Sequence, residues 1–255
     1  MKEDILEQIV DDYLQHLGYF TRHNIRFRPS HDSEHYDSQQ DSVSSDIDII
    51  GINPQRQGPE AVMVVSCKSW QHGFRPGYWI EAIEKNKVVH GKEAWRTFRE
   101  LANPKWSQPF VAKVKELTGS ETFTYVTAVT KLIDDAEGTQ RRKWETHPRF
   151  LENIAGRSSG EPPSRTTNPI RILTMREMLD TLYANEGKTP AASDLGRMLQ
   201  LVKASGWQMS SAKAFEKKPE TSPLPVPEPA AAGMMQSASA QTEAIAERLA
   251  PCTSA

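Results

Sequence analysis

The sequence has little cysteine, little net charge and no long apolar run. Only two cysteines occur in 255 residues, Cys67 and Cys252, too few for a disulfide framework, which favours a reducing compartment. The formal net charge is -2, so any contact with a polyanion must come from a local basic patch. The sequence contains no apolar run of about 18 residues, and the start MKEDILEQIV lacks the apolar segment of a signal peptide. We therefore expect a cytoplasmic protein that does not enter a membrane.

Composition divides the chain into a long folded part and a tail. Hydrophobic residues make up 37% and charged residues 25%, as is typical of a globular protein of this size. From about residue 213 the sequence is rich in Pro, Ala, Ser and Glu, and such a segment buries too little apolar surface to offset its ordering entropy. We expect one domain over residues 1–212 and a disordered tail over residues 213–255.

Hydrophobic periodicity predicts an α/β fold with a mixed sheet of about four to five strands between helices. Thr174 and Glu177 have the spacing of a capping box, which predicts a helix start at residue 175. The expected strands cover residues 19–27, 45–51, 61–69, 122–130 and 170–174; the expected helices cover 4–17, 78–101, 110–117, a stretch around Trp144, 175–183 and 192–204; and mobile loops are expected at 28–45 and 156–168.

Two neighbouring strands carry the most informative residues. The runs 45–51 and 61–69 are joined by turn residues and predict a hairpin, in which alternate side chains share a face. Asp46 and Asp48 therefore share one face of the first strand, and Ser66 and Lys68 share one face of the second. A carboxylate and a lysine that meet in this way could hold a divalent ion and offset the charge of a phosphate.

The order of helix, strand, hairpin, long helix and strand resembles the restriction-endonuclease-like superfamily, called PD-(D/E)xK, and within it the branch of Holliday-junction resolvases and Mrr-type restriction proteins. Residues Asp48-Ile49-Ile50-Gly51 match its acidic motif, and Val64-Val65-Ser66-Cys67-Lys68-Ser69 matches the next motif except at Ser66, where the family carries an acid. The resemblance covers roughly residues 1–135 and extends at most to about residue 185. It implies a three-layer α/β core with a metal-dependent nuclease site.

The resemblance also implies roles for particular residues. Asp48 would be the principal metal ligand, Lys68 the catalytic lysine, and Ser66 would occupy the third catalytic position. Glu7 on the first helix would be an auxiliary ligand, although the nearby acids Glu3, Asp4, Asp11 and Asp12 leave that choice open. Asp46 could supply the charge that Ser66 lacks. The expected cofactor is Mg²⁺ or Mn²⁺.

Several residues near these motifs have simpler interpretations. Cys67 points away from Lys68, which predicts a small core residue. Trp70 to Phe74 could stack on bases or could pack the corner after the strand. The acids and histidines of residues 31–37 match no metal-binding pattern and predict a solvated loop. The basic groups Arg22, His23, Arg26 and Arg28, and Arg141, Arg142 and Lys143, could contact phosphates or could be solvated.

Three functions fit these observations. The leading interpretation is a magnesium-dependent deoxyribonuclease that hydrolyses phosphodiester bonds in DNA, weakened by Ser66. The alternative is a catalytically inactive protein of the same fold that binds nucleic acid or a protein partner. The third is an unrelated α/β domain. DNA is the expected partner; a homodimer and a protein ligand for the tail are compatible with the sequence.

Overall fold

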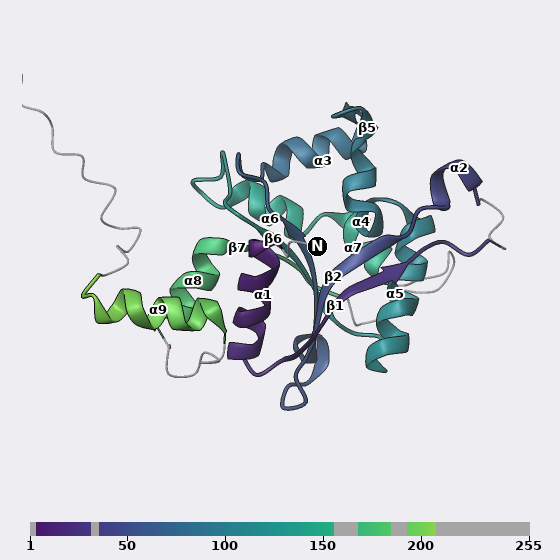
Figure 1. Ribbon diagram of the computed structural model, residues 1–255. Helices are drawn as coiled ribbons and strands as arrows, with labels where there is room; N and C mark the ends of the chain where they lie inside the picture. The colour runs from purple at the N-terminus through teal and green to yellow at the C-terminus, as the bar shows by residue number, and fades with distance from the viewer. Residues whose placement is uncertain (1–3, 32–35, 156–167, 185–192, 208–255) are drawn as a thin grey trace, which may run out of the picture. The chain divides into compact units, whose positions relative to one another are not determined.

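The computed structural model describes residues 4–31, 36–155, 168–184 and 193–207, all within the compact unit Met1–Met209 (Figure 1). These residues form an α/β domain with a five-stranded mixed sheet and helices on both faces. The predicted three-layer α/β core is therefore confirmed. The predicted tail at 213–255 and nearly all of the loop predicted at 156–168 lie outside the described residues.

The elements follow one another in an order that alternates strands and helices after the first hairpin. The strands of the main sheet are β1 (Phe20–Phe27), β2 (Ser45–Ile52), β3 (Val62–Lys68), β6 (Thr124–Val129) and β7 (Ile170–Thr174), and a small hairpin is formed by β4 (Val88–Val89) and β5 (Lys92–Glu93). The α-helices are α1 (Ile5–His16), α2 (Ser38–Asp41), α3 (Pro76–Glu84), α4 (Arg99–Ala102), α5 (Pro104–Thr118), α6 (Thr139–Glu145), α7 (Pro148–Ile154), α8 (Met175–Ala184) and α9 (Asp194–Ala204).

The strand order in the main sheet is β1-β2-β3-β6-β7. The first three strands are antiparallel, and β3, β6 and β7 run parallel to one another. Parallel neighbours need long crossover connections, and here these connections carry α3 to α7. The strand β3 is the central strand, so its residues have neighbours on both sides.

Helices cover the two faces of the sheet unequally. Figure 1 shows α1 and α8 on one side of the sheet and α4, α5 and α7 on the other. The smaller core cluster contains Leu6 and Val10 of α1 with Val65 of β3, while the larger cluster contains Val64 of β3 with the side chains of α3 to α7. Because side chains alternate along a strand, Ser66 and Lys68 lie on the face of the larger cluster.

The first helix forms as its sequence predicts. Asp4 is the N-cap, and its carboxylate accepts a hydrogen bond from the amide of Leu6 at 2.9 Å. Gly18 has a φ of 86°, which glycine adopts without strain just after a helix end. Among the described residues, no helix has the length and apolar character needed to cross a membrane.

The helix predicted over residues 78–101 is wrong as a continuous element. The chain leaves α3 after Glu84, forms the β4–β5 hairpin and a 3₁₀ turn at Ala94–Phe98, and then forms the short helix α4. Asn86, His90 and Gly91 have positive φ values of 47°, 50° and 76°, which an α-helix does not accommodate. The apolar residues of this stretch follow the core surface and not a single helical face.

Two other predictions are corrected. The helix predicted at 110–117 begins earlier, at Pro104, where the side chain of Asn103 accepts the amide of Lys105 at 3.1 Å and Pro occupies the first helical position. The loop predicted at 28–45 contains the short helix α2. Its Asp41 is 1% exposed and pairs with Lys105, so this end of the loop is anchored to α5.

The predicted capping box at the start of α8 is confirmed. The Glu177 carboxylate accepts the Thr174 amide at 2.7 Å, and the Thr174 hydroxyl accepts the Glu177 amide at 3.3 Å. Glu177 also accepts a hydrogen bond from Arg141 at 2.7 Å. Burial would raise the pKa of Glu177, but the hydrogen bonds from Arg141 and Thr174 outweigh burial and lower it.

We expect Thr174→Ala to lower the free energy of unfolding by about 1 kcal/mol, because the helix loses one half of its capping box. Urea denaturation followed by circular dichroism would measure this loss. The matched control is Thr146→Ala, which removes an exposed hydroxyl that bonds only the carbonyl of Arg142. The control should change stability by less than about 0.5 kcal/mol. Equal effects of the two substitutions would show that the cap contributes little.

Candidate functional site

The register of β2 and β3 brings Asp48 and Ser66 side by side. Ile49 pairs with Val65 and Ile50 pairs with Val64, so continuing the antiparallel register places Asp48 opposite Ser66. One oxygen of the Asp48 carboxylate accepts the backbone amide of Cys67 at 2.5 Å. This hydrogen bond holds the Asp48 carboxylate against the end of β3, close to Lys68.

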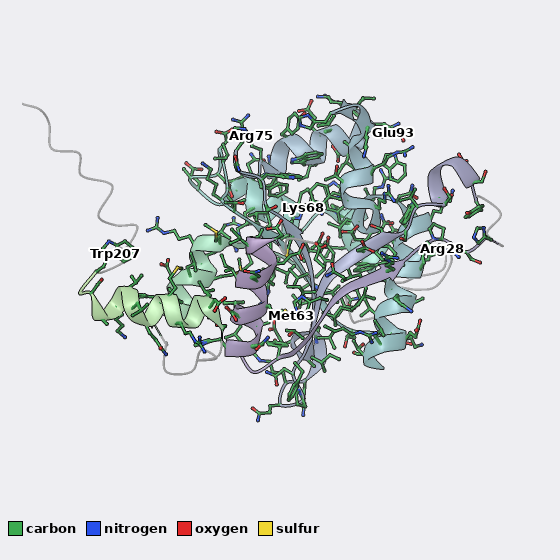
Figure 2. All side chains as sticks on the ribbon, in the orientation of Figure 1. Arg28, Met63, Lys68, Arg75, Glu93 and Trp207 are labelled. Atoms are coloured by element: carbon green, nitrogen blue, oxygen red, sulfur yellow. The ribbon has the colours of Figure 1, made fainter. Side chains whose placement is uncertain are left out.

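Lys68 is held by contacts other than an ion pair. Its ammonium donates to the hydroxyl of Ser66 at 3.0 Å and lies 5.5 Å from the centre of the Phe98 ring. Within the part of the chain that the structure describes, Lys68 forms no ion pair with a carboxylate. Figure 2 shows Lys68 near the centre of the molecule, at the end of β3 opposite Met63.

A second buried carboxylate faces this group from the helical layer. Glu100 of α4 is 6% exposed, and it accepts a hydrogen bond from the hydroxyl of Tyr125 at 2.5 Å. The Tyr125 hydroxyl also lies near the hydroxyl of Ser66, which acts on its pKa. Glu100, Tyr125 and Ser66 therefore form a polar strip between α4 and β3.

The charges in this strip act on one another. Burial raises the pKa of Asp48, Glu100 and Asp46 raise it further, and Lys68 and the amide of Cys67 oppose that rise. Burial and the nearby Glu100 raise the pKa of Tyr125 well above its usual value, so the phenol stays protonated. A carboxylate with a raised pKa, beside a lysine and a second carboxylate, is the kind of group found at functional sites.

Asp46 lies at the margin of the group. It shares the face of Asp48, as the sequence predicts, and it is close enough to raise the pKa of Asp48. It is more exposed than Asp48, however, and its carboxylate is 3.9 Å from the guanidinium of Arg26 on β1. Asp46 could neutralise part of a bound cation's charge, but its direct partner is Arg26.

Glu7 lies on α1, which packs against the other face of the sheet. It lines a small cavity of about 120 Å³ together with Asp11, His23 and Asn24. Its charge acts on Cys67, and it is absent from the main influences on the pKa of Asp48. Asp4, the N-cap of α1, contacts the segment after Lys68 by accepting a hydrogen bond from the hydroxyl of Ser69.

The structure also bears on the simpler interpretations of Cys67 and Arg141. Cys67 is partly buried and packs against the smaller core cluster, as the sequence predicts, and burial raises the pKa of its thiol. Arg141 is used within the fold, because its guanidinium contacts Glu145 at 3.1 Å and Glu177 at 2.7 Å. It is not a free phosphate ligand.

The donor set suits one kind of metal ion. Among the described residues, no three His, Cys, Asp or Glu side chains are grouped so as to hold a metal. Asp48 and Glu100 provide two carboxylates, each with one oxygen that forms no hydrogen bond to another described residue. Magnesium commonly binds through one or two carboxylates and completes its shell with water and substrate phosphate. The pair therefore fits Mg²⁺ or Mn²⁺ and does not fit a closed zinc site.

Glu100 and Tyr125 are the site residues that the sequence interpretation missed. Glu100 stands between the apolar residues Phe98, Leu101 and Ala102, and a charge in such a position usually needs a partner. That signal was present, but residue 100 is distant in sequence from residues 48 and 68. Nothing in the sequence pairs α4 with the end of β3.

Comparisons of the chain with protein-family models, with curated proteins and with solved structures found no match. The resemblance to the PD-(D/E)xK superfamily therefore stays a prediction from residues and element order.

We expect Asp48→Asn to leave stability at pH 7 equal to or higher than that of the wild type, because the folded state raises the pKa of this carboxyl and so disfavours its charge. Asparagine can still accept the amide of Cys67. The cost of the charged form is present above the folded pKa and disappears below the unfolded pKa of about 3.9, so the difference should shrink as the pH falls. Denaturant titrations at several pH values would measure it.

The matched control is Asp41→Asn. Asp41 is a buried carboxylate that pairs with Lys105 and accepts the amide of Asp37 at 2.7 Å. Removing its charge leaves Lys105 without its partner and should cost about 3 kcal/mol. A loss of similar size in Asp48→Asn would show that Asp48 is structural.

Proposed function

We propose that this domain is a metal-dependent DNA endonuclease, with Asp48, Ser66, Lys68 and Glu100 at its active site. The observation that carries the proposal is that Glu100 accepts a hydrogen bond from Tyr125, whose hydroxyl also lies near Ser66, the position at which the family pattern has an acid. In this proposal the missing acid is supplied by α4 instead of by β3. The match of residues 48–51 and 64–69 to the family motifs supports the same chemistry.

Asp48 and Glu100 are the residues that would hold Mg²⁺ or Mn²⁺. When bound there, the ion would polarise a phosphodiester and lower the pKa of a coordinated water. The protein's share is positional. The amide of Cys67 orients Asp48, and the hydroxyl of Tyr125 orients Glu100, so both carboxylates are held before substrate arrives.

Lys68 has a separate role in the proposal. Its ammonium donates to the Ser66 hydroxyl and lies over the face of Phe98, and its charge acts on Asp48. Such a group offsets the negative charge that builds on the phosphate oxygens during hydrolysis. Ser66 is then a positioning residue that holds Lys68, and it need not bind the metal.

A second candidate is a nuclease-like domain that binds nucleic acid without cutting it. Ser66 favours this candidate, because a neutral hydroxyl replaces a charged ligand on the strand where the family pattern has one. The two candidates differ in whether Asp48 and Glu100 retain metal affinity. DNA as the substrate, a cytoplasmic location, a homodimer and a protein ligand for the tail remain parts of the proposal that follow from the sequence alone.

The direct test is cleavage of supercoiled plasmid DNA by the purified full chain in Mg²⁺ or Mn²⁺. We expect nicking by the wild type, its loss on adding EDTA, and a fall in rate of at least about 100-fold in Lys68→Ala and in Glu100→Gln. Glu100→Gln is the more informative variant, because glutamine can still accept the Tyr125 hydroxyl while the carboxylate charge is removed.

The matched controls are Lys113→Ala and Glu116→Gln. These residues form an exposed pair on α5, with the Lys113 ammonium 2.8 Å from the Glu116 carboxylate, so their loss should leave cleavage unchanged. Equal inertness of wild type, Lys68→Ala and Glu100→Gln on plasmid, duplex and single-stranded DNA would contradict the enzyme proposal. Cleavage that survives Glu100→Gln would contradict the assignment of Glu100.

A further inference from the structure

A large open groove lies directly beyond the end of β3. It has a volume of about 1020 Å³ and is lined by the segment after Lys68, by the first turn of α3 and by the β4–β5 hairpin. Ligand sites in proteins are commonly about 300–1,000 Å³, so this groove is larger than one small molecule needs. In Figure 2, Arg75 marks the side of the groove next to α3, and Lys68 lies further in, at the end of its strand.

The groove is continuous with the candidate site. Ser69 lines it and follows Lys68 in sequence, and the amide of Trp70 donates to the carbonyl of Lys68 at 2.8 Å. The Phe98 ring beneath Lys68 also contacts Trp70 at 6.1 Å and Trp79 at 5.4 Å between ring centres. One aromatic cluster therefore supports both Lys68 and the floor of the groove.

The lining has one sign of charge. Among the described residues that line it are Arg75, Lys92, His72 and His90, and no aspartate or glutamate. Arg75 pairs with Asp134 at 3.1 Å, but both side chains are mostly exposed, so this pair contributes little and can be exchanged for a phosphate. Local positive charge in a chain of net charge -2 favours a polyanionic ligand.

The aromatic side chains have the arrangement of a stacking surface. Tyr78 is 46% exposed, and its ring packs edge-on against Trp79 at 5.8 Å, which holds it in place. Trp70 stacks on Trp79 at 5.0 Å and is partly exposed. Of the residues 70–74, for which the sequence left stacking or packing open, Phe74 is buried in the core, while Trp70 is partly exposed and borders the groove beside Tyr78.

We propose that this groove binds single-stranded DNA, so that the enzyme acts where unpaired nucleotides adjoin the scissile phosphate. Unpaired bases can stack on Tyr78 and Trp70 while Arg75 and Lys92 contact their phosphates, which is the combination that single-strand-binding sites use. Within a base-paired duplex each base face is covered by the neighbouring pairs, so internal bases cannot stack on these side chains. This inference rests on the proposed function, because it names the substrate class of the same site.

The test measures binding without cleavage. Fluorescence anisotropy of a short labelled single strand, and of a blunt duplex of the same sequence, would be recorded with the full chain in EDTA. We expect tighter binding of the single strand, and about tenfold weaker binding in Tyr78→Ala, since a stacked base commonly contributes about 1–3 kcal/mol. Tyr78→Phe keeps the ring and should keep the affinity. Lys92→Ala should weaken binding and make the logarithmic salt slope smaller by about 0.7.

The matched controls are Trp207→Ala, which removes an exposed aromatic side chain just after α9, and Lys113→Ala on α5. Both should bind like the wild type. The inference is overturned if single strand and duplex bind equally, or if Tyr78→Ala and Lys92→Ala behave like the controls, even when the protein cuts DNA. If the protein cuts no DNA but both groove variants selectively lose binding of the single strand, the single-strand groove is supported and the nuclease proposal is contradicted.

Discussion

The proximity of two carboxylates, the partly buried Asp48 and the buried Glu100, is the constraint on which the site depends. Burial, together with the nearby charge of Glu100, raises the pKa of Asp48 and so disfavours its charged form. The fold offsets this cost with the amide of Cys67, the hydroxyl of Tyr125 and the charge of Lys68. Such an arrangement lowers the stability of the folded state, and proteins commonly keep a destabilising arrangement where function requires it.

Both the sheet and the helical layer contribute residues to the candidate site. Strand β3 is the central strand, and its alternation separates Cys67, which packs under α1, from Ser66 and Lys68, which face the larger cluster. Glu100 faces these residues from the helical layer, on the short helix α4 that follows the β4–β5 hairpin. The connection that carries Glu100 also forms a wall of the groove. The candidate catalytic carboxylate and the candidate substrate surface therefore depend on one segment.

The parts that could be predicted from the sequence are those set by local rules. Alternation placed Asp48, Ser66 and Lys68 on one face, the spacing of Thr174 and Glu177 predicted the start of α8, and Asp4 and Gly18 bound α1 as expected. The position of Glu100 could not be predicted, because it depends on the backbone turns at Asn86 and His90 that break the expected long helix. Glu7 lies on α1, which packs on the other face of the sheet, and its role as an auxiliary ligand stays a prediction.

The measurement closest to the centre of this account is the affinity of Mn²⁺ for the wild type, Asp48→Asn, Glu100→Gln and Asp46→Asn by isothermal titration calorimetry. We expect one site in the wild type and affinity at least about tenfold weaker in both Asp48→Asn and Glu100→Gln, because each removes a carboxylate from a site that has two. Asp46→Asn should cause a smaller loss, since Arg26 is the direct partner of Asp46. Unchanged affinity in Glu100→Gln, with a large loss in Asp46→Asn, would contradict the role of α4 in completing the site.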